Sequence, residues 1–297
     1  MSHHHHHHHA PEGNTAHIRV AFFLNLAFTL VEIAGGLWTN SMAILSDALH
    51  DLGDSLSLGL AWYFQKLSTK KGDRKYSFGY QRFSLLGAII NGMILIIGSV
   101  FVLQEAIGRL WQPEATHAAG MMGLAVVGIV VNGAAVLRLK KGSSLNERVV
   151  SLHLLEDVLG WVAVLVGGAI MYVWEVPILD PLLSIGISLY VLWNVYGNLR
   201  QSFRILLQAV PTDKDMGHIR QKILELPEVA EVHDIHLWSM DGHNSIFTVH
   251  LRTRELMSME EIGELKQTIR GLLEAEHIHH ATIEVEHPGE QHLQMDC

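Results

Sequence analysis

Four long stretches of this chain contain no charged side chain. They cover residues 83–104, 115–137, 158–174 and 181–199, and each is between 17 and 23 residues long. A helix needs roughly 20 predominantly apolar residues to cross a hydrocarbon core about 30 Å thick. The four stretches therefore predict transmembrane helices.

Two further apolar stretches precede these four, at residues 18–38 and 42–65. Polar side chains interrupt both of them. The interrupting residues are Asn25 and Glu32 in the first stretch, and Asp47, His50, Asp51 and Asp54 in the second. Counting both stretches, we expect a multi-pass α-helical membrane protein with six transmembrane helices.

The basic residues in the loops predict the orientation of these helices. Six Lys and Arg residues lie between residues 66 and 82, and four lie between residues 138 and 148. The loops on the opposite side carry a single basic residue, Arg109. Because basic loops stay in the cytoplasm, we expect both termini there. No basic segment precedes a short apolar core with a small-residue cleavage site, so we expect no cleavable signal peptide.

The C-terminal part of the chain, residues 208–297, has a different composition. It contains 17 of the 30 acidic residues but only 7 of the 21 basic ones. Phosphate repels such a domain, which argues against nucleic-acid binding. The single cysteine, Cys297, excludes an internal disulfide framework and a cysteine-based zinc knuckle. We expect a disordered His-rich tail at 1–16, a transmembrane domain at 17–207 and a cytosolic domain at 208–297.

Seven consecutive histidines, His3 to His9, stand near the N-terminus. Such a run is either an engineered purification tag or a native metal-collecting tail. Both origins stay open, and nothing in the predicted fold depends on the run.

Ionisable side chains inside the predicted spans are the strongest functional signal. An aspartate at the middle of a bilayer costs about 2.5–3.5 kcal/mol on insertion scales. His50 and Asp54 are four residues apart, as are His153 and Asp157, so each pair lies on one helix face. Two histidines and two carboxylates on facing helices make a tetrahedral site of the kind that Zn²⁺ prefers. Co²⁺ and other divalent first-row ions also suit these ligands, whereas Ca²⁺ and Mg²⁺ fit them poorly.

A purely structural role, in which these side chains pair to hold helices together, is the alternative. It is the better reading of one pair alone, but the repetition of His-x-x-x-Asp in two polar-interrupted spans favours a metal site. Asp47 lies three residues before His50 and is a candidate for an acceptor behind the ligands or a proton carrier. Asp51 lies one residue off the ligand face, so we expect it to point to water or to another helix.

Residues 208–297 predict a small α+β domain with the order helix, strand, strand, helix, strand. Helical periodicity covers 215–226 and 258–276, and the second helix begins with a capping pattern of Ser258 and Glu261. Alternation of apolar and polar residues predicts strands at 231–240, 245–253 and 282–286. Asp241 and Gly242 mark a hairpin turn between the first two strands. Ten histidines lie in this acidic domain, a density that indicates metal capture.

Several of these residues resemble the motifs of a known family, the cation diffusion facilitators, which transport divalent metals. The span-two signature of that family resembles residues 41–54, Ser-Met-Ala-Ile-Leu-Ser-Asp-Ala-Leu-His-Asp-Leu-Gly-Asp. Its span-five motif matches residues 153–157, His-Leu-Leu-Glu-Asp, and the start of its span six matches Asp180-Pro181. The resemblance covers roughly residues 16–290 and includes the metallochaperone-like order of the C-terminal domain.

The resemblance implies a homodimer in a bacterial inner membrane that exports metal from the cytosol in exchange for protons. It implies a transport site, usual in zinc transporters of the family, made of His50, Asp54, His153 and Asp157. It also implies a cytosolic metal site made of His233, His250, His279 and Glu286, with Cys297 donated across the dimer.

Two loops depart from the pattern of many family members. The loop between spans two and three carries Tyr76 and Tyr80 where other members have histidines, so we expect no metal site there. The loop at 138–148 lacks the His-rich insert of many vesicular eukaryotic members, which makes this chain more similar to bacterial ones.

The expected function is exchange of a divalent metal, Zn²⁺ first, for protons across a lipid bilayer. Metal binding requires neutral imidazole and ionised carboxylate, so protons compete for the ligands. A membrane-anchored metal sensor and an intramembrane metalloenzyme are the alternatives. The sensor has no need of charged residues at mid-bilayer, and the sequence lacks the His-Glu-x-x-His arrangement of a zincin-type hydrolase. The choice among Zn²⁺, Co²⁺, Cd²⁺ and Fe²⁺ stays open.

Overall fold

The computed structural model describes residues 13–68, 70–139 and 145–290. The N-terminal histidine run and Cys297 fall outside this part of the chain. The side chains of some helical residues, among them His153, are also outside the description.

The chain forms two compact units. One comprises Met1–Gln65 and Gly87–Leu199, and the other comprises Lys66–Leu86 and Arg200–Cys297. The second unit therefore includes the segment that joins the second and third helices, in addition to the C-terminal region.

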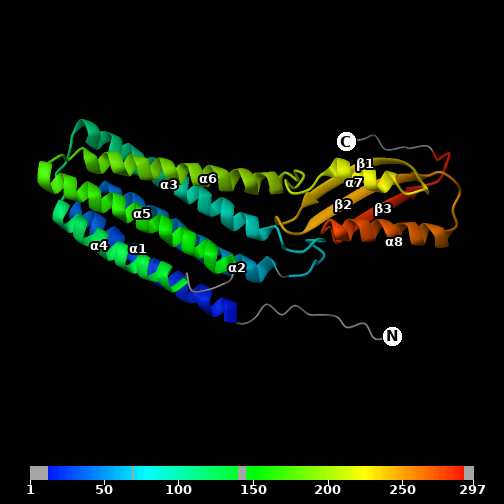
Figure 1. The fold of residues 1–297 in the computed structure, drawn as a ribbon, viewed down its shortest axis with the longest axis horizontal. Coiled ribbons are helices and arrows are strands. Elements are labelled where there is room, and N and C mark those ends of the chain that lie inside the picture. The colour runs from blue at the N-terminus through cyan, green and yellow to red at the C-terminus, as the bar shows by residue number, and fades with distance from the viewer. Residues whose placement is uncertain (1–12, 69, 140–144, 291–297) are drawn as a thin grey trace. The chain divides into compact units, whose positions relative to one another are not determined.

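Six long helices run through the first part of the chain (Figure 1). They are α1 (Gly13–Thr39), α2 (Met42–Ser68), α3 (Phe83–Trp111), α4 (Ala118–Leu139), α5 (Leu145–Trp174) and α6 (Leu179–Leu206). Within the described residues, α3, α4, α5 and α6 are each long and apolar enough to cross a membrane. The other two, α1 and α2, have 27 residues each, but polar side chains interrupt them. The protein is thus a multi-pass α-helical membrane protein.

The helices pack around Trp161 of α5, which is 1% exposed. Ile44 from α2 and Met121 from α4 belong to the same buried cluster. α4 approaches α5 closely because Gly128 has no side chain: a methyl group there would lie 2.3 Å from an atom of the Trp161 ring. Since α4 also packs against α1, these helices form one group around the tryptophan.

α3 and α6 share a second buried cluster. It joins Leu95 of α3 to Val191 and Val195 of α6. Large apolar side chains point outward from both helices, such as Phe101, which is 68% exposed, and Trp193, which is 75% exposed. An extended apolar surface of this kind is covered by lipid or by another protein.

The C-terminal part has the order predicted from the sequence. Its elements are α7 (Met216–Leu224), β1 (Val229–Ser239), β2 (Ser245–Thr253), α8 (Met259–Ala275) and β3 (His280–Glu286). β2 is the central strand, antiparallel to β1 and parallel to β3. The predicted hairpin turn joins β1 to β2, with Gly242 in the left-handed region at φ +96°. Oδ1 of Asp241 accepts from the N–H groups of His243 at 2.9 Å and Asn244 at 2.8 Å.

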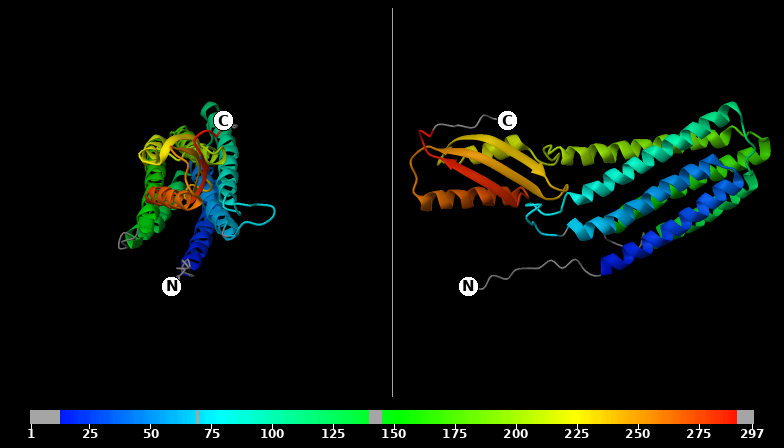
Figure 2. Two further views of the ribbon diagram at one scale, coloured as in Figure 1. Left: turned by 90° about the vertical axis from the view of Figure 1, so that its right-hand side faces the viewer. Right: turned by 180° about the vertical axis from the view of Figure 1, so that it is seen from behind.

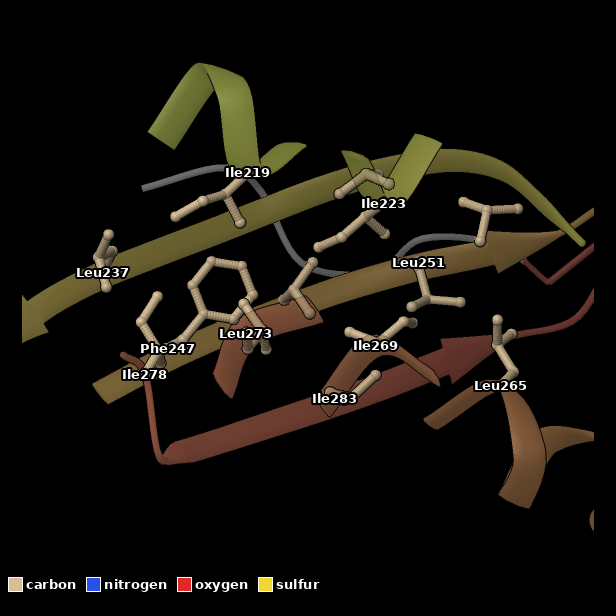
Figure 3. Packing of buried hydrophobic residues seen from close by; sticks show 13 residues of the cluster. Ile219, Ile223, Leu237, Phe247, Leu251, Leu265, Ile269, Leu273, Ile278 and Ile283 are labelled. Atoms are coloured by element: carbon tan, nitrogen blue, oxygen red, sulfur yellow. The ribbon is translucent and has the colours of Figure 1, made fainter. Parts of the chain in front are cut away.

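Both helices and all three strands contribute to a single hydrophobic core in this domain (Figure 3). Its members include Ile219 and Ile223 of α7, Phe247 and Leu251 of β2, and Leu265, Ile269 and Leu273 of α8. Because the two helices share one core, they cover the same face of the sheet. The right-hand view of Figure 2 shows the strands from the side that neither helix covers. Side chains that alternate with the core residues lie on that face.

α8 begins with the capping box that the sequence predicts. The Ser258 hydroxyl accepts from the N–H of Glu261 at 3.3 Å, and the Glu261 carboxylate accepts from the N–H of Ser258 at 2.7 Å. We expect Ser258→Ala to lower the unfolding free energy of this domain by about 1 kcal/mol, since it removes a cap acceptor. Urea unfolding of the full-length protein in detergent measures the change. Ser258→Thr keeps the acceptor and serves as control, and equal midpoints for Ala and Ser would contradict the capping role.

Candidate metal centres

α2 carries two pairs of ionisable side chains, each pair at four-residue spacing. In the first pair, Nε2 of His50 lies 3.8 Å from Oδ2 of Asp54, so the two predicted ligands share one face. In the second pair, Asp47 and Asp51 are both buried. Asp51 is therefore packed against protein and not exposed to water. Of the two expected positions, facing water or facing another helix, the structure has the second.

α1 packs its polar side chains against α2. Nδ2 of Asn25 donates to the backbone oxygen of Asp51 and to Oγ of Ser55, both at 3.0 Å. Glu32 is 1% exposed, and its carboxylate lies within electrostatic reach of Asp47 and Asp51. The polar residues that interrupt the two helices thus face each other.

α5 brings a further acid to the same region. The carboxylate of Asp157 lies within electrostatic reach of those of Asp47 and Glu32. The two helices approach closely here, because a methyl group on Gly160 of α5 would lie 3.6 Å from Oδ1 of Asp47. His153 stands in α5 one turn before Asp157, and its side chain is outside the described part. Buried carboxylates of α1 and α2 and the half-buried carboxylate of Asp157 therefore converge, and such a group needs cations or protons to offset its charge.

A residue of α6 caps the first turn of α2. The Asp180 carboxylate accepts from the Ser41 hydroxyl at 2.5 Å, the N–H of Met42 at 2.7 Å and the N–H of Ala43 at 3.2 Å. The first N–H groups of a helix lack partners inside the helix and carry partial positive charge, so a carboxylate stabilises them. Asp180 itself is 1% exposed. The sequence singled out Asp180 as a motif residue but did not predict this cap.

Two more side-chain contacts join α6 to its neighbours. Oγ of Ser188 lies 2.8 Å from Oγ of Ser46 in α2. The hydroxyl of Tyr190 donates to the carboxylate of Glu156 in α5. α6 therefore holds both helices that carry the candidate ligands.

The second group of candidate ligands lies on the sheet of the C-terminal domain, one from each strand. His233 of β1 pairs with His250 of β2, and Glu286 of β3 lies on the same face. Nε2 of His233 is 3.0 Å from Oε1 of Glu286, and Nδ1 of His250 is 3.8 Å from the same oxygen. One ligand atom from each residue lies within 4.8 Å of the others, so a single ion can reach all three. They alternate with the core residues Val249 and Leu251, which places them on the face that the helices leave open.

Of the two other residues predicted for this site, the structure describes only His279. His279 precedes β3 and is exposed, and it lines a surface hollow together with Arg270 and Glu274. α8 ends shortly before it, and His277 turns the chain at φ +58°. Within the described residues of one chain, the group whose ligand atoms lie within 4.8 Å of one another contains the other three and not His279. Cys297 falls outside the described residues.

The tyrosines of the loop between α2 and α3 are bonded to Asp73. Oδ2 of Asp73 accepts from the Tyr80 hydroxyl at 2.8 Å, and Oδ1 accepts from the N–H groups of Tyr76 and Lys75. These donors, with the N–H of Tyr76 foremost, hold the pKa of the Asp73 carboxyl below its usual value. The rings of Tyr76 and Tyr80 lie 4.7 Å apart. The two tyrosines thus help to order the loop.

Both groups have the donor chemistry of divalent first-row metals. Each offers imidazole nitrogen together with carboxylate oxygen, a mixture that suits ions of intermediate hardness such as Zn²⁺. In the sheet group, Nη2 of Arg252 lies 3.6 Å from Oε2 of Glu286, which leaves Oε1 facing the two histidines. The sheet group therefore brings three ligand atoms close enough to share one ion, and the membrane group offers ligands of the same types.

Comparison with known proteins covers both parts of the chain. Residues 18–207 match the family described as the cation efflux transmembrane domain. Residues 211–288 match the cytoplasmic domain of cation efflux proteins. The second match identifies the C-terminal α+β domain as the cytoplasmic part of such a protein.

Individual relatives align along nearly the whole chain. The zinc transporter ZitB of Escherichia coli is 33% identical, over 96% of this chain and 92% of that protein. The metal cation efflux system protein CzcD of Cupriavidus metallidurans is 33% identical, over 90% and 86%. The cadmium, cobalt and zinc/H⁺-K⁺ antiporter of Bacillus subtilis is 31% identical, over 94% and 91%. The chain therefore belongs to the cation diffusion facilitators, a family of cation efflux transporters and not of enzymes.

Proposed function

We propose that this protein exports divalent metal, with Zn²⁺ as the preferred cargo, from the cytosol in exchange for protons. One observation carries the proposal: His50 and Asp54 of α2 and Asp157 of α5 belong to a group of ionisable side chains gathered inside a helical membrane unit. Charged groups at that depth are costly and mark ion pathways. The names of the E. coli and B. subtilis relatives support the choice of zinc as cargo and of protons as counter-ion.

Four side chains form the transport site in this proposal. They are His50, Asp54, His153 and Asp157. Two imidazoles and two carboxylates complete the tetrahedral coordination that Zn²⁺ favours. Asp47 lies behind them, where it accepts a hydrogen bond from a ligand or carries a proton.

Protons and metal compete for the same ligands, which couples their movements. An imidazole binds metal only when it is neutral, and its ordinary pKa near 6.5 allows protonation on the more acidic side of the membrane. The site reaches each side in turn as α1, α2, α4 and α5 rock against α3 and α6. The packing of α4 with α1 and α5, and of α3 with α6, supports this division.

The protein acts as a homodimer in the inner membrane, with six spans and both termini in the cytoplasm. The basic loops on either side of α3 and α4 support the orientation. The cytosolic domain binds metal through His233, His250 and Glu286, with His279 as a further ligand and Cys297 contributed across the dimer. Metal at this site favours the transport-ready dimer. The long helices lie in the lipid bilayer, and the protein does not bind nucleic acid.

Purified protein in vesicles tests the exchange. With an acidic interior, a zinc dye inside and the membrane potential clamped, zinc added outside enters as protons leave. Each proton exchanged across one pH unit supplies about 1.4 kcal/mol, which supports about tenfold accumulation of zinc. We expect accumulation to disappear when nigericin collapses the gradient.

Other outcomes separate the alternatives. Zinc entry that is indifferent to the gradient contradicts proton antiport. Metal binding without flux favours a sensor, and product formation without flux favours an enzyme.

A further inference from the structure

Asp234 occupies an irregular position in β1. Its backbone lies in the left-handed region at φ +47°, and the register of β1 against β2 shifts between His233 and His236. Such a conformation is strained for a residue with a side chain, although Asp and Asn tolerate it best. A bulge of this kind changes the direction of a side chain within a strand. The fold therefore accepts local strain to place Asp234.

The bulge brings the Asp234 carboxylate to His250. Oδ2 of Asp234 lies 3.5 Å from Nε2 of His250, and Oδ1 lies 2.8 Å from Nε2 of His236. The other ring nitrogen of His250, Nδ1, faces Oε1 of Glu286 at 3.8 Å. One nitrogen of His250 thus faces the candidate ligands, and the other faces Asp234.

This geometry matters because a neutral imidazole has one proton and one free lone pair. Metal binds the nitrogen without the proton, and a carboxylate that accepts the proton fixes the tautomer and the ring orientation. We infer that Asp234 is a positioning residue of the cytosolic metal site, which holds the His250 proton on Nε2 and so directs the unprotonated Nδ1 to the cation. The inference rests on the proposed site at His233, His250 and Glu286.

Glu284 is the competing acceptor for the same nitrogen. Its Oε2 lies 3.4 Å from Nε2 of His250, but the Glu284 side chain is 62% exposed whereas that of Asp234 is 14% exposed. Water and salt screen an exposed carboxylate, and mobility weakens its hold on one geometry. Asp234 is therefore the acceptor that fixes the ring, and Glu284 provides a control at nearly the same distance.

The test uses the protein with both of its domains, purified in detergent. Residues 2–9, which contain the histidine run, are removed, and His50→Ala and Asp157→Ala disable the proposed transport site. In that protein the sheet group is the remaining proposed site. Co²⁺ is the probe, because its visible absorption reports coordination, and competition gives the affinity for Zn²⁺. Asp234→Asn keeps the size of the side chain and tolerates the left-handed region. We expect it to weaken metal binding about 10–100-fold, while Glu284→Gln weakens binding about fivefold at most.

Asp234→Gly separates positioning from folding. Glycine removes the acceptor but relieves the backbone strain, so the metal-free protein should unfold at the same temperature or higher. The rise in unfolding temperature that saturating Co²⁺ gives should shrink. Unchanged affinity in Asp234→Asn, or equal losses in Asp234→Asn and Glu284→Gln, overturns the inference. If His233→Ala removes no Co²⁺ binding from the starting protein, the proposed cytosolic site fails and the positioning role falls with it.

Discussion

Asp157→Asn is expected to reduce zinc flux in vesicles to about 1% of wild type or less. Asp157 is the acid through which α5 reaches the buried carboxylates of α1 and α2. The substitution keeps the size of the side chain but removes the charge that faces the cation. Removing one partner of a buried charge pair costs about 3–5 kcal/mol, which corresponds to a factor of about 10²–10⁴. Dye-based flux measures the loss, and titration calorimetry on the detergent-purified protein shows whether binding is lost with it.

The neighbouring acid provides a matched control. Glu156 precedes Asp157 but accepts from the Tyr190 hydroxyl of α6. Glu156→Gln also removes one negative charge from the same turn of α5. It should keep most of the flux, because its carboxylate engages α6 and not the ligand group. Equal loss in the two variants would mean that only the total charge matters, and full flux in Asp157→Asn would refute the site.

The membrane helices were predictable because charged side chains are costly inside the bilayer, so that stretches without charge indicate spans. Charge-free stretches located the central parts of α3, α4, α5 and α6, but only two of their ends, the start of α3 and the end of α5. α3 continues to Trp111 because Glu105 and Arg109 stand one turn apart and pair at 3.2 Å. A charge that ends an apolar stretch in the sequence is therefore no obstacle to the helix when a partner lies within reach.

Spacing along α2 predicted which side chains share a face, but not what each face meets. The four-residue interval placed His50 beside Asp54, and the structure has them 3.8 Å apart. The burial of Asp51 depends on Asn25 and Glu32 of α1, and helical periodicity contains no information about a neighbouring helix. The cap on α2 was not predicted for the same reason. Asp180 and Ser41 are 139 positions apart, and helical periodicity does not report contacts between distant residues.

The order of the cytosolic elements followed from alternation and capping signals, but the bulge did not. Aspartate is depleted in strands, so Asp234 in the middle of β1 was the available signal of this break in pairing. That break decides which side chains surround His250. The ligand role of His279 stays a prediction, because it rests on resemblance and His279 lies outside the strand that carries Glu286. β3 begins at His280, two residues before its predicted start.

We expect Asp180→Ala to be one of the most destabilising substitutions in the helical unit. The Asp180 carboxylate accepts from the Ser41 hydroxyl and from the N–H groups of Met42 and Ala43, all buried. Each donor left unpaired away from water costs about 1–3 kcal/mol, so the combined loss should be about 3–5 kcal/mol. Unfolding in mixed micelles, followed by tryptophan fluorescence, measures it. Asp180→Asn keeps one oxygen acceptor and should lose less.

Asp180→Ala should also weaken zinc binding at the metal site. The reason is that α2 is a continuous helix from its capped end to its ligands. At 1.5 Å per residue, His50 lies about 12 Å from Met42 along the axis, so a first turn that is no longer held changes where the imidazole sits. Glu114→Ala is the control, since it removes a half-exposed carboxylate paired with Arg109 at 3.2 Å and should cost about 0–1 kcal/mol. If Asp180→Ala is no less stable than Glu114→Ala, the cap does not hold α2. If stability falls while zinc affinity stays, contacts further along α2 fix the ligands instead.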